Sequence, residues 1–239
     1  MSLPKINTPE YRLNIPSTDE EITYRPFLVK EEKLLLIAHE TGDEKATFSA
    51  IKDLIKSCVT QELAVDLLPM FDIEYIFLNI RAKSVGEIAK LNIICPDDEK
   101  TKVIVEVDLT KINVEMDEKH NPRIELTDNI GILMSYPSLD IVQEHAVEGG
   151  TGDQATESLF NMIVECMYQI WEGEEVQDAS DFSRGEKMEF LESLSHLQFE
   201  KIQNFFETMP ALKHEVKITN PKTKKKSTVT LQGIQSFFE

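Results

Sequence analysis

Hydrophobic residues are most continuous in the stretch 67–86, and their arrangement predicts a buried helix. The apolar side chains cover nearly every direction of a helical wheel, which is typical of a helix surrounded by protein. Asp72 and Glu74 lie near the expected start, and Arg81 and Lys83 lie near the expected end, as the helix dipole favours. A proline suits the first turn and a glycine follows the last one. We therefore expect this helix to be the central element of the core.

The residues before this helix predict a helical part over 23–86 that follows an extended arm over 1–22. The arm has three prolines and few large apolar groups, and it either packs on its own domain or docks on a partner subunit. A short edge strand is expected over 22–28. The apolar run 31–39 is too short to distinguish helix from strand, whereas apolar residues recur at helical spacing over 44–60.

After residue 86 the hydrophobic period changes to two. Alternating runs over 88–95 and 101–108 flank a turn, which is a hairpin pattern, and shorter alternating runs continue to residue 136. We expect a small antiparallel sheet over 87–136 with one buried and one solvated face.

Helical spacing returns over 137–210, the segment that also carries most of the acidity, and Ser183 with Glu186 forms a candidate capping box. The expected helices cover residues 137–146, 155–171, 184–194 and 197–209. The last segment, 211–239, alternates again and predicts a β-hairpin with a tail. The fold class is therefore α+β: a helical N-terminal part around a buried central helix, a small antiparallel sheet, and a second helical part ending in a β-hairpin. The pattern leaves open whether the two alternating regions share one sheet.

The net charge of the 239-residue chain is −18, with 43 acidic and 25 basic side chains. Such a field disfavours binding to nucleic acid or to an anionic membrane. The charge is uneven, because residues 140–200 hold fifteen acids and two bases, whereas residues 201–239 hold seven bases and three acids. No stretch approaches the ~20 apolar residues of a membrane span, and the N-terminus is not typical of a signal peptide. We expect a soluble cytosolic protein.

Sequence motifs of catalysis and metal binding are missing from the chain. The run Gly149-Gly150-Thr151-Gly152 lacks the lysine of a phosphate-binding loop, and we interpret it as a flexible loop. The histidines are scattered singly, and Cys95 has no second cysteine at the spacing of a zinc knuckle. The three cysteines stand far apart and suit buried thiols in a reducing compartment. We therefore expect no enzyme activity, no cofactor and no metal ion.

Charged segments provide the candidate binding residues instead. The first is an acidic segment that is either a solvated loop or an electrostatic dock for a basic partner; its members are Glu172, Glu174, Glu175, Asp178 and Asp181. The second is the lysine-rich tip of the last hairpin, with Lys222, Lys224, Lys225 and Lys226. This tip either blunts a sheet edge or contacts an acidic surface, including the acidic segment of a second copy. Arg81 and Lys83, expected to be exposed, are weaker candidates.

The central helix also carries a resemblance. Residues 68–87 read Leu-Pro-x-Phe-Asp-Ile-Glu-Tyr-Ile-Phe-Leu-x-Ile-Arg-Ala-Lys-Ser-Val-Gly-Glu, which resembles the signature segment of baseplate hub assembly proteins of T-even-like contractile-tailed bacteriophages. Residues 24–33 and 231–238 are similar to the same family. The resemblance implies a non-enzymatic, chaperone-like factor that binds other hub proteins in the host cell cytoplasm during phage tail assembly, with self-association as a further option. A permanent structural subunit of the virion baseplate hub is the alternative, and an acidic inhibitor that mimics nucleic acid is a remote one.

Overall fold

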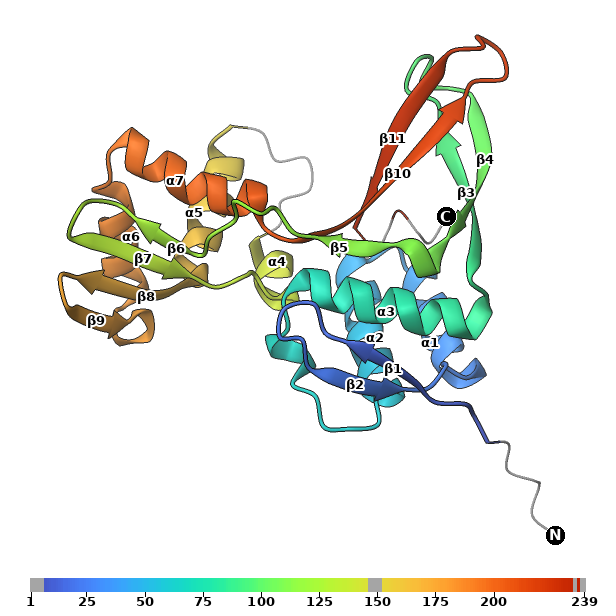
Figure 1. Cartoon of the computed structure of the whole chain (residues 1–239), viewed down its shortest axis with the longest axis horizontal. Coiled ribbons are helices and arrows are strands. Elements are labelled where there is room, and N and C mark those ends of the chain that lie inside the picture. The colour runs from blue at the N-terminus through green and yellow to red at the C-terminus, as the bar shows by residue number, and fades with distance from the viewer. Residues whose placement is uncertain (1–6, 146–151, 234–235, 237–239) are drawn as a thin grey trace. The chain divides into compact units, whose positions relative to one another are not determined.

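The computed structural model describes residues 7–145, 152–233 and 236 (Figure 1). The fold is α+β, and the chain forms two compact units. Unit 1 comprises residues 1–115 and 211–239, and unit 2 comprises residues 116–210. Unit 2 is therefore a single insertion into the sequence of unit 1. In the described part of the chain, no helix combines the length and the apolar character that a membrane crossing requires.

The central helix of unit 1 is α3 (Met70–Val85), and the prediction that it is buried is confirmed. Large side chains on all its faces are buried, among them Ile73, Ile76 and Phe77. The helix begins three residues later than the stretch 67–86 suggests, because Pro69 is its N-cap and the residues before it form a short 3₁₀ turn. After Val85 the backbone enters the left-handed region at Gly86, where φ is 142°.

The remaining N-terminal elements pack around α3. The run 31–39 lies in a helix, and the amphipathic helix expected over 44–60 ends at Cys58. Their bounds, with those of the preceding strands, are β1 (Tyr11–Asn14), β2 (Glu21–Tyr24), α1 (Val29–Glu40) and α2 (Glu44–Cys58). β1 and β2 form an antiparallel pair, and Ile15 and Ile22 are buried. The described part of the expected arm is thus folded against its own unit.

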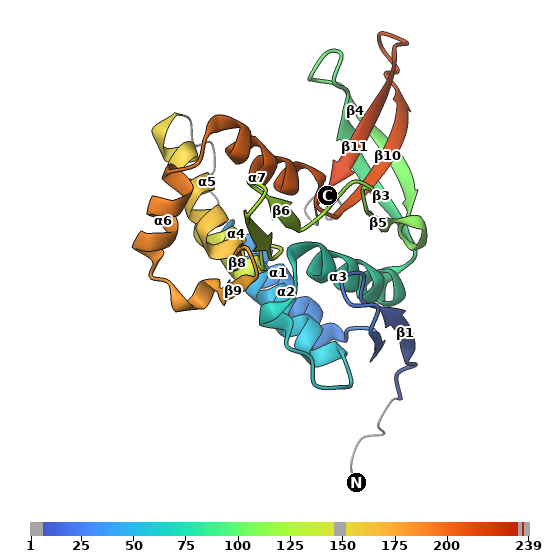
Figure 2. The same cartoon turned by 60° about the vertical axis from the view of Figure 1, so that its left-hand side comes forward.

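Two hairpins complete unit 1, and we call them together the paired hairpins. The first consists of β3 (Ile88–Ile94) and β4 (Lys102–Asp108), and the second of β10 (Ala211–Thr219) and β11 (Lys226–Gln232). Figures 1 and 2 show them side by side with their loops at the same end. Alternating side chains from both hairpins enter one core with residues of α3, among them Leu91, Val107, Leu212 and Ile218.

The small sheet expected over 87–136 does not exist as one sheet. Its strands belong to three sheets: β3 pairs with β4, β5 (Asn113–Glu115) pairs with β10, and β6 (Arg123–Glu125) pairs with β7 (Ile130–Met134) in unit 2. Alternation predicts each strand but does not predict which strand it pairs with. The partner of β5 is β10, which lies far away in the sequence. Of the strands that the structure describes in the first alternating region, β3 to β7, only β5 shares a sheet with the second region.

Unit 2 is a four-stranded antiparallel sheet packed against helices. The strand order is β6-β7-β8-β9, with β8 at Met167–Glu172 and β9 at Glu175–Asp178. The helices are α4 (Leu139–His145), α5 (Asp153–Cys166), α6 (Arg184–Glu192) and α7 (His196–Thr208). The helix expected over 155–171 is therefore wrong beyond Cys166, because Met167 to Trp171 pair with β7 instead. The capping box of Ser183 and Glu186 is confirmed at the start of α6.

Candidate functional surfaces

The two units differ strongly in charge. Twenty of the 43 acids and five of the 25 bases lie in residues 116–210, so that unit 2 has a net charge of −15 and unit 1 a net charge of −3. A strongly negative unit attracts basic partners over about a Debye length of ~10 Å and accelerates their encounter. Most of the net negative charge of the chain therefore lies in unit 2.

Four acids of the predicted acidic segment lie on one hairpin, which we call the acidic hairpin (residues 169–178). It consists of residues 169–172 of β8, the strand β9 and their turn, so that Glu172, Glu175 and Asp178 lie in paired strands. Glu172 and Glu175 are directly opposite each other, Glu174 lies in the turn, and Asp178 accepts a hydrogen bond from Gln169 at 2.9 Å. Asp181 follows in the 3₁₀ turn Ala179–Asp181. All five carboxylates are exposed to solvent.

The four lysines of the basic tip are exposed; three lie on a loop that has a defined internal structure, and Lys226 is the first residue of β11. Buried Asn220 organises this loop: its Oδ1 accepts from the backbone N–H of Lys222 at 2.9 Å and of Thr223 at 3.3 Å. Lys224 has a φ of 63°, which continues the tight turn. The lysine ammonium groups are therefore displayed from a constrained backbone.

A carboxylate from the other hairpin fixes this loop. Asp97, in the turn between β3 and β4, accepts a hydrogen bond from Asn220 Nδ2 at 3.0 Å and another from the Thr223 hydroxyl. These bonds, the one from Thr223 first, hold the pKa of Asp97 below its usual value. Next to it, Asp98 accepts from the hydroxyl and the N–H of Thr101 and so closes its own turn. The tips of the paired hairpins are thus joined to each other.

Arg81 and Lys83 differ from the expectation that they are exposed. Both are half-buried at the end of α3, and burial lowers the pKa of Arg81. Lys83 forms an ion pair with Glu87, and its Nζ lies 5.2 Å from the centre of the Tyr11 ring. Sequence reveals neither the burial of Arg81 nor the partners of Lys83 inside unit 1.

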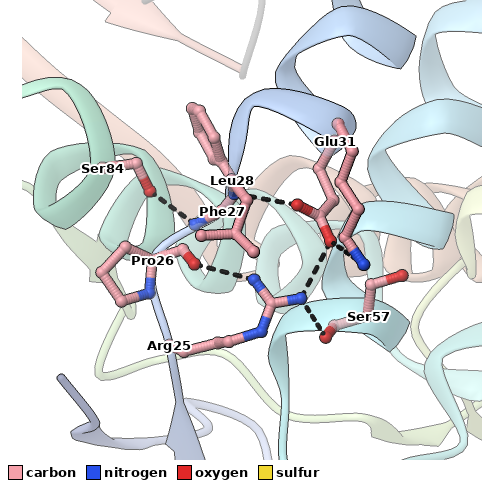
Figure 3. Close-up of polar contacts among 8 residues, drawn as sticks. Arg25, Pro26, Phe27, Leu28, Glu31, Ser57 and Ser84 are labelled. Atoms are coloured by element: carbon pink, nitrogen blue, oxygen red, sulfur yellow. Dashed lines mark hydrogen bonds and ion pairs between the residues drawn. The ribbon is translucent and has the colours of Figure 1, made fainter. Parts of the chain in front are cut away.

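Sequence reasoning missed a polar network at the start of α1 (Figure 3). The Arg25 guanidinium donates to Glu31 Oε1 at 2.8 Å and to the carbonyl oxygens of Ser57 at 2.9 Å and Pro26 at 2.9 Å. The other carboxylate oxygen of Glu31 accepts from the N–H of Leu28 at 2.8 Å. The network connects β2, α1 and α2 through one buried carboxylate.

The protonation of Glu31 reflects two opposing effects. Only 3% of the residue is exposed, and this burial opposes ionisation. The bonds from Arg25, from the Leu28 N–H and from Lys30 outweigh it and hold the pKa of Glu31 below its ordinary value. Glu31 is therefore a buried anion whose charge Arg25 neutralises. Such a pair holds elements of the fold together and is not a site for a ligand. No spacing in the sequence pairs Arg25 with Glu31, which lie six residues apart.

A protein-family model described as T4 bacteriophage base plate protein matches residues 8–239. The chain belongs to this family. The match includes both units, and it confirms the resemblance at the level of a base plate protein, whose partners are other base plate proteins. Comparison with curated proteins and with solved structures found no match.

The cysteines of this base plate protein are buried thiols, as expected. Burial raises the pKa of Cys58 to about 11 and that of Cys166 to about 12, so that both stay protonated at neutral pH. Among residues 7–145, 152–233 and 236, no group of three or more His, Cys, Asp or Glu side chains could hold a metal ion. Residues 149–151 of the glycine-rich run lie outside the described residues.

Proposed function

We propose that this base plate protein is a non-enzymatic, chaperone-like assembly factor that binds other subunits of the baseplate hub in the host cytoplasm. Membership of the family supports a place among base plate proteins. The observation that carries the proposal is the basic tip, whose backbone Asn220 and Asp97 hold in one conformation. A surface that is ordered before binding loses less conformational entropy when the partner arrives.

The two charged surfaces have separate parts in this proposal. The basic tip contacts an acidic surface of a hub subunit, and the acidic hairpin attracts a basic one. Exposed charges of this kind contribute mainly to the encounter rate and to orientation, and salt weakens them. Arg81 and Lys83 are left out of the proposal, because their charges are half-buried or paired inside unit 1.

A permanent structural subunit of the hub is the second candidate function, and the description of the family as a base plate protein favours it. The two functions differ in the fate of the chain. An assembly factor is absent from finished particles, whereas a structural subunit is present there in a fixed ratio to other hub proteins.

The test is affinity capture of the protein from infected cells at low and at high salt, with mass spectrometry of the captured partners and of purified virions. We expect hub subunits in the low-salt capture, fewer at high salt, and no copies of the chain in virions. A fixed number of copies in virions would establish the structural subunit instead. Capture of host DNA-binding proteins without baseplate subunits would refute both functions in favour of an inhibitor that mimics nucleic acid.

A pair of charge variants locates the contact. K224Q/K225Q removes two charges from the basic tip, and K33Q/K45Q removes two exposed charges elsewhere in unit 1. We expect the first variant to lose most of the captured hub subunits and the second to retain them. Equal capture by both variants would show that the tip makes no partner contact.

A further inference from the structure

Unit 2 contains a pocket of about 340 Å³ between the acidic hairpin and α6. Its apolar lining includes Ile130, Ile170, Phe182 and Phe190, all of which are partly exposed. The volume lies at the lower end of the range for ligand sites, about 300–1,000 Å³, and fits one large side chain or two small ones. Covering such half-buried aromatic and aliphatic groups with an apolar side chain removes apolar surface from water, which favours binding.

The rim of this pocket is acidic. Glu172 and Glu175 come from the acidic hairpin, and Glu186 comes from the first turn of α6, where it forms the capping box. The hydrogen bonds from Ser183 hold the pKa of Glu186 below its usual value, so that Glu186 carries its charge at neutral pH. Lys187 is the single base that lines the pocket. An occupant with positive charges is therefore favoured.

Glu172 and Glu175 are also direct cross-strand partners. Like charges directly opposite each other on paired strands are destabilising. Neither carboxylate has an ion pair within the described part of the chain. A lysine or arginine of a bound partner would relieve this repulsion, and its attraction to the two carboxylates would add to the affinity.

A free strand edge runs along the pocket. Within the described part of the chain, β9 pairs with β8 alone, and all four of its residues are exposed. Two of them, Glu175 and Gln177, line the pocket, as expected for alternate residues on one face of a strand. An extended segment that adds to such an edge can place alternate side chains over the same face.

We propose that β9 and this pocket bind an extended basic segment of another protein, which adds an antiparallel strand and inserts one aromatic or aliphatic side chain. A lysine or arginine two residues from this anchor lies against Glu172 and Glu175 together, because the two carboxylates are side by side across the strands. The segment belongs to a different protein and not to a second copy, because the basic tip of this chain, residues 220–226, contains no large apolar side chain. The proposal rests on the proposed function in one respect, namely that the occupant is a protein partner.

The probe is an end-blocked peptide, Thr-Lys-Thr-Phe-Thr-Lys-Thr, in which both lysines and the phenylalanine share one face of a strand. Binding is measured by isothermal titration calorimetry, because Trp171 alternates with Ile170 and Glu172 and its indole lies over Gly131, away from the face that these two residues share. We expect saturable binding to the full chain that weakens about tenfold when phenylalanine becomes alanine or lysines become glutamates, and that weakens as salt rises.

Three variants test the assignment of the rim. E172Q/E175Q weakens binding about fivefold or more, whereas K187Q, which removes the opposing charge, strengthens it. The matched control E189Q/E192Q changes the charge of unit 2 by the same amount with exposed residues of α6 outside the lining. It retains the affinity. No saturation by the peptide, or equal losses in E172Q/E175Q and E189Q/E192Q, would overturn the proposal.

Two further measurements separate this proposal from the proposed function. Capture of hub subunits that E172Q/E175Q leaves unchanged, together with a peptide that does not bind, would overturn the pocket and retain the assembly factor. Peptide binding without any capture of hub subunits would support the pocket and reject the assembly factor. Self-association in ultracentrifugation that E172Q/E175Q abolishes would make a second copy the occupant and overturn the proposal.

Discussion

Trp171 occupies the space that a side chain at Gly131 would need. The two residues are direct partners in the β7–β8 pairing, and a Cβ atom placed on Gly131 would lie 2.0 Å from Cζ2 of the indole and 2.5 Å from the carbonyl oxygen of Ile124. On its other side, the indole lies under the Arg123 guanidinium, whose Cζ is 4.0 Å from the ring centre. The glycine therefore lets the tryptophan cross β7 and reach β6.

This relationship predicts that Gly131→Ala destabilises unit 2. Neither backbone nor indole can yield easily, and overpacking of this kind costs about 1–3 kcal/mol or more. Gly185→Ala is the matched control, because it lies in α6 with only Ser183 Oγ near its Cβ, at 3.9 Å. Alanine there is neutral or stabilises the helix by about 0.5–1 kcal/mol. Urea unfolding followed by Trp171 fluorescence measures both, and equal stability of the two variants would contradict the close contact.

A second prediction concerns the paired hairpins. Asp97→Ala removes the acceptor for Asn220 and Thr223, and each lost hydrogen bond costs about 1 kcal/mol. The effect is local, so we expect faster amide hydrogen exchange in residues 220–226 with little change in the global unfolding midpoint. Glu106→Ala, which breaks an exposed ion pair with Lys90 at 3.5 Å, leaves that exchange unchanged. Unaltered exchange in Asp97→Ala would show that the tips are ordered independently.

A third prediction follows from buried Asp72 in α3. It accepts hydrogen bonds from the N–H and the hydroxyl of Ser17, but burial dominates and raises the pKa to about 6 from an ordinary 3.8. Between these two values the unfolded chain loses this proton while the folded chain keeps it. The contribution of Asp72 to stability is therefore complete below pH 3.8 and is lost as the pH rises through 6.

The variant Asp72→Asn removes this titration. From pH 4 to pH 7, the variant should become more stable relative to the natural chain by up to about 3 kcal/mol of unfolding free energy. This value follows from ~1.4 kcal/mol per pKa unit. Other acids titrate equally in both proteins and cancel from the difference. Chemical denaturation at several pH values provides the measurement, and a difference that does not vary with pH would mean that the pKa is ordinary.

The network of Figure 3 gives a fourth prediction. Arg25→Ala leaves Glu31 as a buried anion without its main partner, which costs about 3–5 kcal/mol. Glu31→Gln added to this variant restores part of the loss, because the uncompensated charge is gone. Lys30→Ala is the control: its Nζ is 3.2 Å from Glu31, but the lysine side chain is 72% exposed, and such pairs contribute about 0–1 kcal/mol. A double-mutant cycle by urea unfolding tests the coupling, and additive losses would contradict it.

The sequence predicts those elements whose causes are local. The all-round apolar character of α3, the spacing in α2 and the capping box at Ser183 are all contained within one helix, and each prediction is confirmed. Strand β8 was missed because Ile163, Met167 and Ile170 continue the helical spacing of α5. Its pairing with β7, more than thirty residues earlier, decides its conformation.

The candidate surfaces also divide into features with a local cause in the sequence and features that depend on distant residues. Charge alone locates the acidic segment and the basic tip. The order of the tip depends on Asp97, which is 123 residues away from Asn220 in the sequence. The pocket beside β9 also requires α6 to lie over the sheet, and no spacing of residues indicates that.

The insertion of unit 2 has a consequence for how this chain can change. Glu115 and Ala211, the residues at the two ends of unit 1 that flank the insertion, are direct partners in the β5–β10 pairing. The chain therefore leaves unit 1 and returns to it at one place, as it does at the turn of an ordinary hairpin. Topologically, unit 2 is a very long hairpin loop, and this acidic part of the protein can be exchanged or deleted without rethreading the fold that carries it.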